Sequence, residues 1–147
     1  MLKSMLAETK VLLESAAAGA AQTDLDGTVI DLAQDGGYDG VLFIAQLGDV
    51  SATCVLELQC QGSAAANGSS PSTEGTTGTF TADATSADNK LMVLDVSRAA
   101  NRYVFSRLKR GTANAVVNSV LAVLYKGKVG PVVQDASVIK SAFVNVK

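Results

Sequence analysis

The sequence contains no histidine and no tryptophan in its 147 residues. Histidine is the commonest general base and metal ligand near neutral pH, so Ser–His pairs, Cys–His pairs and His–metal sites are all excluded. The sequence also has no GxxxxGK loop to hold the phosphates of a nucleotide. We therefore predict that the protein is not an enzyme and has no catalytic residues, no metal site and no cofactor.

Cysteine is scarce, with Cys54 and Cys60 as the only two. The segment between them alternates apolar and polar residues, which predicts a half-buried strand with both thiols on the face that carries Leu56 and Leu58. Six residues of strand span about 20 Å, whereas a disulfide needs Cα atoms within about 7 Å. We therefore expect two buried free thiols, which suit a reducing compartment and are too few for a zinc site.

Long apolar runs are also missing. The longest, 41–45 and 120–125, fall far short of the roughly 18 residues that a transmembrane helix needs. Glu8, Lys10 and Glu14 interrupt any signal-peptide core, so we expect neither a membrane partner nor export through a cleaved signal. Hydrophobic residues make up 48% and charged residues 18% of the chain, which predicts one globular domain rather than a disordered protein.

Acidic and basic residues are concentrated in opposite parts of the chain. Residues 1–95 hold 3 Lys and 13 Asp or Glu, a net charge of −10, whereas residues 96–147 hold 9 Lys or Arg and 1 Asp, a net charge of +8. Either strands from the two parts lie side by side and neutralise each other, or charged surfaces meet across an interface in an assembly. No specific nucleic-acid partner is expected, because the net charge is −2 and 5% of residues are aromatic.

Short apolar runs separated by turn signals predict an all-β protein. Seven or eight strands with short turns favour a single-domain antiparallel β-sandwich, similar to a jelly roll. Residues 62–79 carry no large apolar side chain and many Gly, Ser and Thr, which predicts an exposed, mobile loop. The predicted strands cover residues 28–32, 41–47, 53–61, 91–96, 102–108, 115–125 and 137–146.

The first 20 residues form an N-terminal arm or a first strand, and the sandwich domain is predicted over 21–147. Apolar residues recur at roughly helical spacing over 2–13, so a short helix competes with a strand that starts near Lys10. We favour an arm followed by a strand.

Two predicted strands, 102–108 and 115–125, are apolar on both faces near their middles. A helix is the alternative for 115–125, where Val116, Val120 and Leu124 would share one face, but the density of β-branched residues favours a strand. A sandwich layer leaves one of its faces in water. Strands that are apolar on both faces therefore imply an extra covering layer or a subunit interface.

One motif suggests phosphatase chemistry. Residues 24–28, Asp-Leu-Asp-Gly-Thr, match the DxDGT signature of haloacid-dehalogenase-type phosphatases. That chemistry requires the first Asp at the carboxyl end of a buried parallel strand, and residues 18–23 do not form such a strand. The same acids do not form an EF-hand, because Val29 stands where that loop requires Gly. We interpret the motif as an acidic turn.

Four segments resemble small structural proteins of tailed-bacteriophage virions. The resemblance spans about residues 25–132 and implies a virion component, with a capsid role favoured over a tail role. Similar proteins of this size with a β-sandwich or jelly-roll fold act as capsid decoration or cement subunits. The segments are GYDGVLFI at 37–44, DNKLMVLDV at 88–96, NRYVF at 101–105 and ANAVV at 113–117.

The apolar N-terminal arm and the basic segment after residue 96 supply the candidate contacts. The sandwich does not explain the arm, which can dock on a neighbouring subunit. The basic cluster either protects a solvated edge from strand pairing or meets acidic groups across an interface, and we favour the interface. The candidate interface residues are Leu2, Met5, Leu6, Arg102, Arg107, Lys109 and Arg110.

Together these observations predict a capsid decoration or cement protein. We expect it to form a homo-oligomer, either a trimer or a dimer, and to bind the major capsid protein where capsid subunits meet. Its predicted location is the capsid shell of the virion, assembled in the host cytoplasm. The alternative is a tail, head-tail connector or fibre component of a phage particle with the same fold.

Overall fold

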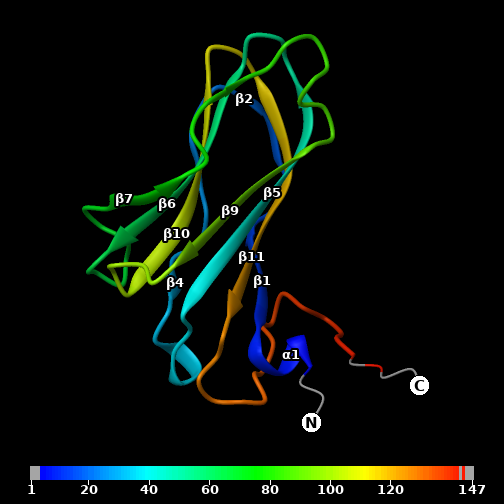
Figure 1. Ribbon diagram of the computed structural model, residues 1–147. Coiled ribbons are helices and arrows are strands. Elements are labelled where there is room, and N and C mark those ends of the chain that lie inside the picture. The colour runs from blue at the N-terminus through cyan, green and yellow to red at the C-terminus, as the bar shows by residue number, and fades with distance from the viewer. Residues whose placement is uncertain (1–3, 143, 145–147) are drawn as a thin grey trace.

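The computed structural model describes residues 4–142 and 144, and almost all of its regular structure is β (Figure 1). Two antiparallel sheets pack face to face as a sandwich, which confirms the predicted all-β, jelly-roll-like fold. The helical parts of the described chain are one α-helical turn, α1 (Met5–Glu8), and one 3-10 turn, η1 (Gln34–Gly36).

Each sheet contains strands from the N-terminal and the C-terminal parts of the chain. The first sheet has the order β1 (Lys10–Ser15), β11 (Ala115–Tyr125), β5 (Gly40–Val50) and β9 (Leu91–Ser97), with β2 (Ala18–Ala21) also paired to β11. The second sheet has the order β3 (Leu25–Asp26), β10 (Tyr103–Gly111), β6 (Val55–Ser63) and β7 (Ser72–Thr76), with β4 (Ile30–Asp31) beside β10 and β8 (Phe80–Thr81) beside β6.

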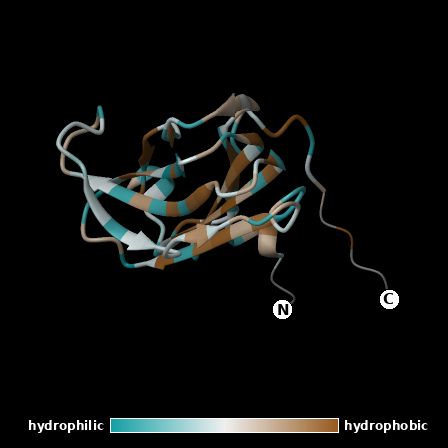
Figure 2. Ribbon diagram, turned by 90° about the horizontal axis from the view of Figure 1, so that it is seen from above, coloured by the Kyte–Doolittle hydropathy of each residue, from teal (hydrophilic) through white to brown (hydrophobic). Residues whose placement is uncertain are grey.

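The core lies between the sheets and follows the period-two alternation of the strands. On β5, Val41, Phe43 and Ala45 are fully buried, and hydrophobic segments run along the strands of both sheets (Figure 2). Cys54 and Cys60 are buried free thiols beside Leu56 and Leu58, as their spacing predicts. Desolvation is the main cause that raises the pKa of the Cys60 thiol to about 12.

At the N-terminus, the single turn α1 precedes β1, which begins at the predicted Lys10. Residues 28–32 were predicted as one strand. In this segment the structure has only the two-residue strand β4, and β3 precedes it at Leu25–Asp26; both pair with β10.

The predicted loop over 62–79 is exposed over most of its length, but residues 62–63 and 72–76 belong to strands. Strand β6 continues to the buried Ser63, and β7 pairs with β6. The Glu74 carboxylate fastens β7, because it accepts backbone N–H groups from Ala100 and Asn101, both at 2.8 Å. Strand β7 is therefore held in place by backbone pairing and by this carboxylate, although it has no large apolar side chain.

The predicted strand over 137–146 is also wrong for its described residues, 137–142 and 144, which form no strand. Residues 134–137 lie along β1, where side chains replace a backbone ladder. Val11 N–H donates to Gln134 Oε1 and Leu13 N–H donates to Ser137 Oγ, both at 2.9 Å.

No helix in the described part of the chain is long and apolar enough to span a membrane.

Candidate assembly interface

The first sheet has an apolar surface on the side away from the core. Directly opposed residues of an antiparallel ladder share a face. Because Phe43 is buried in the core, the flanking Leu42 and Ile44 point outward together with their partners on neighbouring strands. We call this surface the outer face. Its apolar members are Val11 and Leu13 of β1, Leu121 and Val123 of β11, Leu42 and Ile44 of β5, and Leu91 and Val93 of β9.

One row of the outer face is apolar across all four strands. Leu13 opposes Leu121, Leu121 opposes Ile44, and Ile44 opposes Val93. The members at the two sheet edges are well exposed, Leu13 at 41% and Val93 at 51%, and Leu91 is exposed at 60%. Contiguous exposed apolar surface of this kind marks a site of interaction.

Polar groups border the outer face. At one end Tyr125 reaches across Gly40, where a Cβ would overlap its ring, and its hydroxyl donates to Asp95 Oδ1 at 2.7 Å. Partial burial, followed by this hydrogen bond, raises the pKa of Tyr125 to about 12. At the other end Ser119 opposes Gln46. The apolar rows therefore have defined polar limits.

The two strands predicted to be apolar on both faces are covered differently. On β10 the outward Phe105 is 5% exposed, because Gly68 and the Arg107 guanidinium lie against its ring. On β11 the outward Leu121 and Val123 have no comparable cover within the described chain and remain partly exposed. For β10, the chain itself thus supplies the covering layer that was expected over the outward face. For β11 the outer face remains open.

The predicted interface residues divide between the two ends of the chain. Leu2 lies outside the described residues. Met5 on α1 is 78% exposed, whereas Leu6 is half-buried and lines a groove with Pro131 and Val132. Lys109 is exposed on the outward side of β10, where it opposes Glu57.

Arg110 does not belong to an exposed interface. Its side chain is buried, with 4% of the residue exposed, and its guanidinium donates to the carbonyls of Thr23 and Gly19 at 2.9 Å and of Ala115 at 2.8 Å. This arginine ties β10 to β2, to the segment after β2 and to β11 of the same chain. Its role is structural, and the local sequence over 107–110, Arg-Leu-Lys-Arg, does not reveal the carbonyls that it binds.

The acidic partners of Arg102 and Arg107 also belong to the same chain. Arg102 donates to both carboxylate oxygens of Asp31 at 2.7 Å, and Arg107 donates to those of Asp26 at 2.6 and 2.8 Å. The Arg102 guanidinium lowers the pKa of Asp31. At these two arginines, strands from the two parts of the chain lie side by side and their charges neutralise each other, as one of the two alternatives predicts.

The DxDGT motif has the wrong geometry for a phosphatase. Leu25 and Asp26 form β3, which is antiparallel to β10, and the Asp26 carboxylate is engaged by Arg107. Gly27 packs against the buried Glu14. Across the described residues, no group of three or more His, Cys, Asp or Glu is placed to hold a metal ion.

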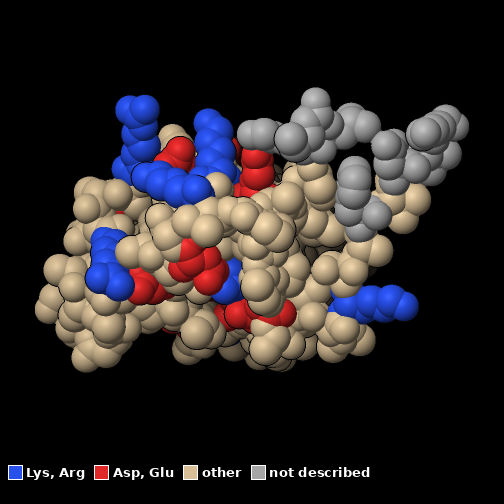
Figure 3. All heavy atoms as spheres, turned by 90° about the horizontal axis from the view of Figure 1, so that it is seen from below, with Lys and Arg blue, Asp and Glu red and all other residues tan. Residues whose placement is uncertain are grey.

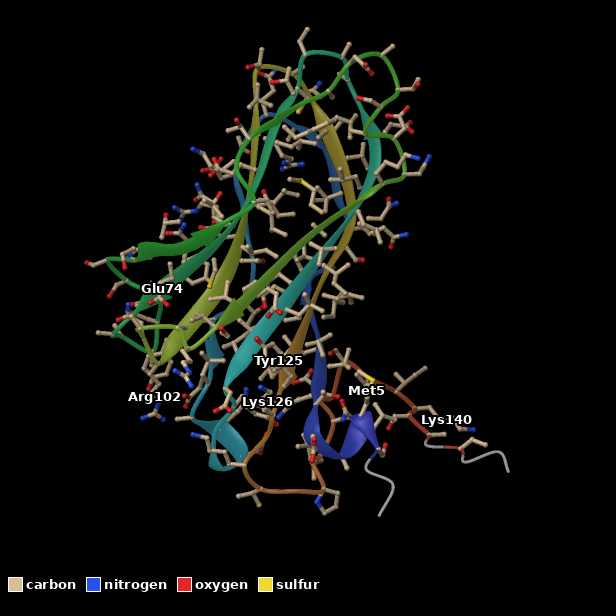
Figure 4. All side chains as sticks on the ribbon, in the orientation of Figure 1. Met5, Glu74, Arg102, Tyr125, Lys126 and Lys140 are labelled. Carbon is tan, nitrogen blue, oxygen red and sulfur yellow. The ribbon has the colours of Figure 1, made fainter. Side chains whose placement is uncertain are left out.

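The terminal segments carry several exposed apolar side chains at one end of the sandwich. Figure 4 shows Met5 and Lys140 on neighbouring segments at the lower right, on the side opposite Glu74 and Arg102. Gln134 joins the two segments, because its Nε2 donates to the carbonyls of Thr9 at 2.7 Å and Leu6 at 3.2 Å. Seen from below, this end also carries interleaved basic and acidic side chains (Figure 3). Its exposed apolar residues are Met5, Val129, Val133, Ile139 and Val144.

The sequence matches no protein-family model and no curated protein. Among solved structures, it is similar to Eiger TNF from S. frugiperda at 8% sequence identity and a TM-score of 0.38. The alignment covers 92% of this chain and 99% of that one.

Proposed function

We propose that the protein is a structural component of a tailed-bacteriophage virion, a capsid decoration or cement protein. Four segments carry the sequence resemblance that motivates this proposal. They lie on or beside strands β5, β9, β10 and β11, so what they share with such proteins is scaffold rather than a reactive site.

The exposed apolar side chains of the two terminal segments are the observation that best supports this function. Met5, Val133 and Ile139 are 78%, 77% and 100% exposed, outside the sandwich core. Exposed apolar side chains of this kind supply the burial on which binding to a larger particle depends. The proposed partner of the terminal end is the major capsid protein, at places where capsid subunits meet.

The proposed mechanism is mechanical. A bound subunit that buries surface on two neighbouring capsid subunits opposes their separation, because anything that binds the assembled state and not the separated one stabilises it. In this mechanism the protein is assembled onto the shell in the host cytoplasm and remains in the virion.

The test uses phage particles that lack the native protein. Added wild-type protein is expected to bind them, and averaged electron-microscopy maps are expected to show its density repeated over the icosahedral shell. Density confined to one vertex would overturn the capsid role in favour of a tail, connector or fibre role. No binding at all would refute the proposed function.

A matched pair of variants tests the docking end. The double variant Met5→Ser with Ile139→Ser removes two exposed apolar side chains from the terminal end and is expected to lower particle occupancy. Phe80→Ser removes a 45% exposed aromatic side chain on the second sheet and is expected to leave occupancy unchanged. Circular dichroism checks that both proteins keep the β-fold. Equal occupancy of the two variants would rule out docking through the terminal segments.

A further inference from the structure

We infer that the outer face of the first sheet is the contact between copies of this chain, packed face to face. The inference deepens the proposed function, on which its biological role rests. The contact itself can be tested on the isolated protein without any phage particle.

The composition of the outer face calls for a covering partner. The row from Leu13 to Val93 contains no polar side chain across four strands, and the neighbouring row ends in a single acid, Asp95. Tyr125 already donates a hydrogen bond to that acid. Covering the rows therefore removes apolar surface from water and leaves no unpaired charge in their middle, which is the favourable case for burial.

A second outer face is the best match for this surface. Apart from Asp95 at the end of one row, this sheet face is uncharged and needs an uncharged partner, because a charged partner placed against it would be desolvated without compensation. The outward side of the second sheet carries Glu57, Arg107 and Lys109 and does not meet this need. The same apolar surface on another copy does, and sheets with apolar faces pack about 10 Å apart.

The size of the outer face also suits a contact between copies. Strands β1 and β9 contribute 6 and 7 residues, and β11 and β5 are longer. With strands about 4.8 Å apart and residues about 3.4 Å apart, the flat footprint is roughly 19 Å by 22 Å. Two such faces together have a footprint of roughly 840 Å², which is below the ~1,200 Å² of standard stable interfaces and in the range of weak contacts that dissociate on dilution.

The first test is the mass of the isolated protein in solution, measured by light scattering and sedimentation over a wide range of concentrations. The wild-type protein is expected to be an oligomer that dissociates on dilution. Leu13→Lys and Val93→Lys each place a charge on an exposed position of the outer face and are expected to shift the protein to monomer. Val133→Lys changes a 77% exposed residue on the C-terminal segment and is expected to leave the mass unchanged.

A labelling experiment keeps the inference testable if a lysine variant fails to fold. The native Cys54 and Cys60 are buried, so an added surface cysteine is the reactive thiol. In Val93→Cys, maleimide labelling is expected to be slow at high protein concentration and fast after dilution, whereas Val133→Cys reacts fast throughout.

The following results would overturn the inference. A monomeric wild-type protein with a freely reactive Val93→Cys thiol leaves the outer face to a different protein. A monomer with a protected thiol means that the chain covers its own outer face. Lysine variants that stay oligomeric place the contact elsewhere. An oligomer that fails to bind particles upholds this contact and counts against the proposed function alone.

Discussion

The backbone N–H of Ser106 on β10 donates to Glu14 Oε1 on β1 at 2.7 Å, so one hydrogen bond joins the two sheets through the core. Glu14 is 2% exposed, and its Oε2 has no hydrogen-bond partner among the described residues. Desolvation raises the pKa of the Glu14 carboxyl to about 8, although the hydrogen bonding of Ser106 opposes the shift. The fold therefore holds this side chain as a neutral acid at neutral pH.

The stability of the protein should consequently fall as the pH rises from about 4.5 to about 8. Below this window the carboxyl is protonated in both the folded and the unfolded chain. Within it, the unfolded chain loses the proton first, so the folded state binds more protons and unfolding becomes easier with rising pH. The slope approaches about 1.4 kcal/mol per pH unit and ends above the folded pKa.

Urea unfolding at a series of pH values measures this slope, and Glu14→Gln provides the comparison. The glutamine keeps the acceptor for Ser106 N–H and cannot ionise, so its free energy of unfolding is expected to vary little over the window. The absence of histidine removes the side chain that would otherwise titrate there. An equal slope in the variant would show that Glu14 is not the titrating group.

Gly27 is expected to be intolerant of substitution because of its contact with Glu14. A Cβ at Gly27 would overlap the Glu14 carboxyl, and the Gly27 backbone N–H is fixed to the Ser106 carbonyl at 2.8 Å. Gly27→Ala should therefore cost about 1–3 kcal/mol of stability, the usual cost of overpacking. Gly19→Ala is the control, since a Cβ there meets nothing within 4 Å. Thermal unfolding compares the two, and similar midpoints would contradict the predicted clash.

Arg110 should contribute far more to the stability of the fold than Arg107, which lies on the opposite face of the same strand β10. Arg110→Met leaves the carbonyls of Thr23, Gly19 and Ala115 without their donor, and a cost of about 2–4 kcal/mol is expected. Arg107→Met removes an ion pair with Asp26, whose side chain is 46% exposed, so a cost below about 1 kcal/mol is expected. Chemical denaturation of both variants tests this order. A smaller loss for Arg110→Met than for Arg107→Met would be incompatible with the structural role of Arg110.

The sequence predicted the strands of the fold more completely than it predicted the surfaces available for contact with other molecules. Period-two alternation located β5, β6, β9, β10 and β11 within a few residues, because burial on one side of a strand is a local signal. The sequence did not predict strand β7, because β7 is held by backbone pairing with β6 and by the contact between Glu74 and Asn101. These two residues are distant in sequence. Burial of Arg110 likewise depends on carbonyls brought in by β2 and β11.

The outer face was indicated only in part. Apolar residues on both sides of 115–125 predicted a covered or subunit-facing strand, but the row from Leu13 to Val93 requires the strand order of the sheet. That order joins residues from four separate parts of the chain, and no local pattern specifies it. The resemblance to virion proteins likewise suggested assembly without locating a surface.

Gln134 should protect the free edge of β1. Its Oε1 accepts Val11 N–H at 2.9 Å and its Nε2 donates to the Thr9 carbonyl at 2.7 Å, so one side chain replaces two bonds of a missing neighbouring strand. An unprotected edge presents backbone groups that can pair with another chain. Gln134→Ala should therefore speed hydrogen exchange at the Val11 amide and increase aggregation on heating. Gln46→Ala, which removes an exposed glutamine at the border of the outer face, is the control and should change neither. Unchanged exchange at Val11 in Gln134→Ala would show that the edge is protected by other means.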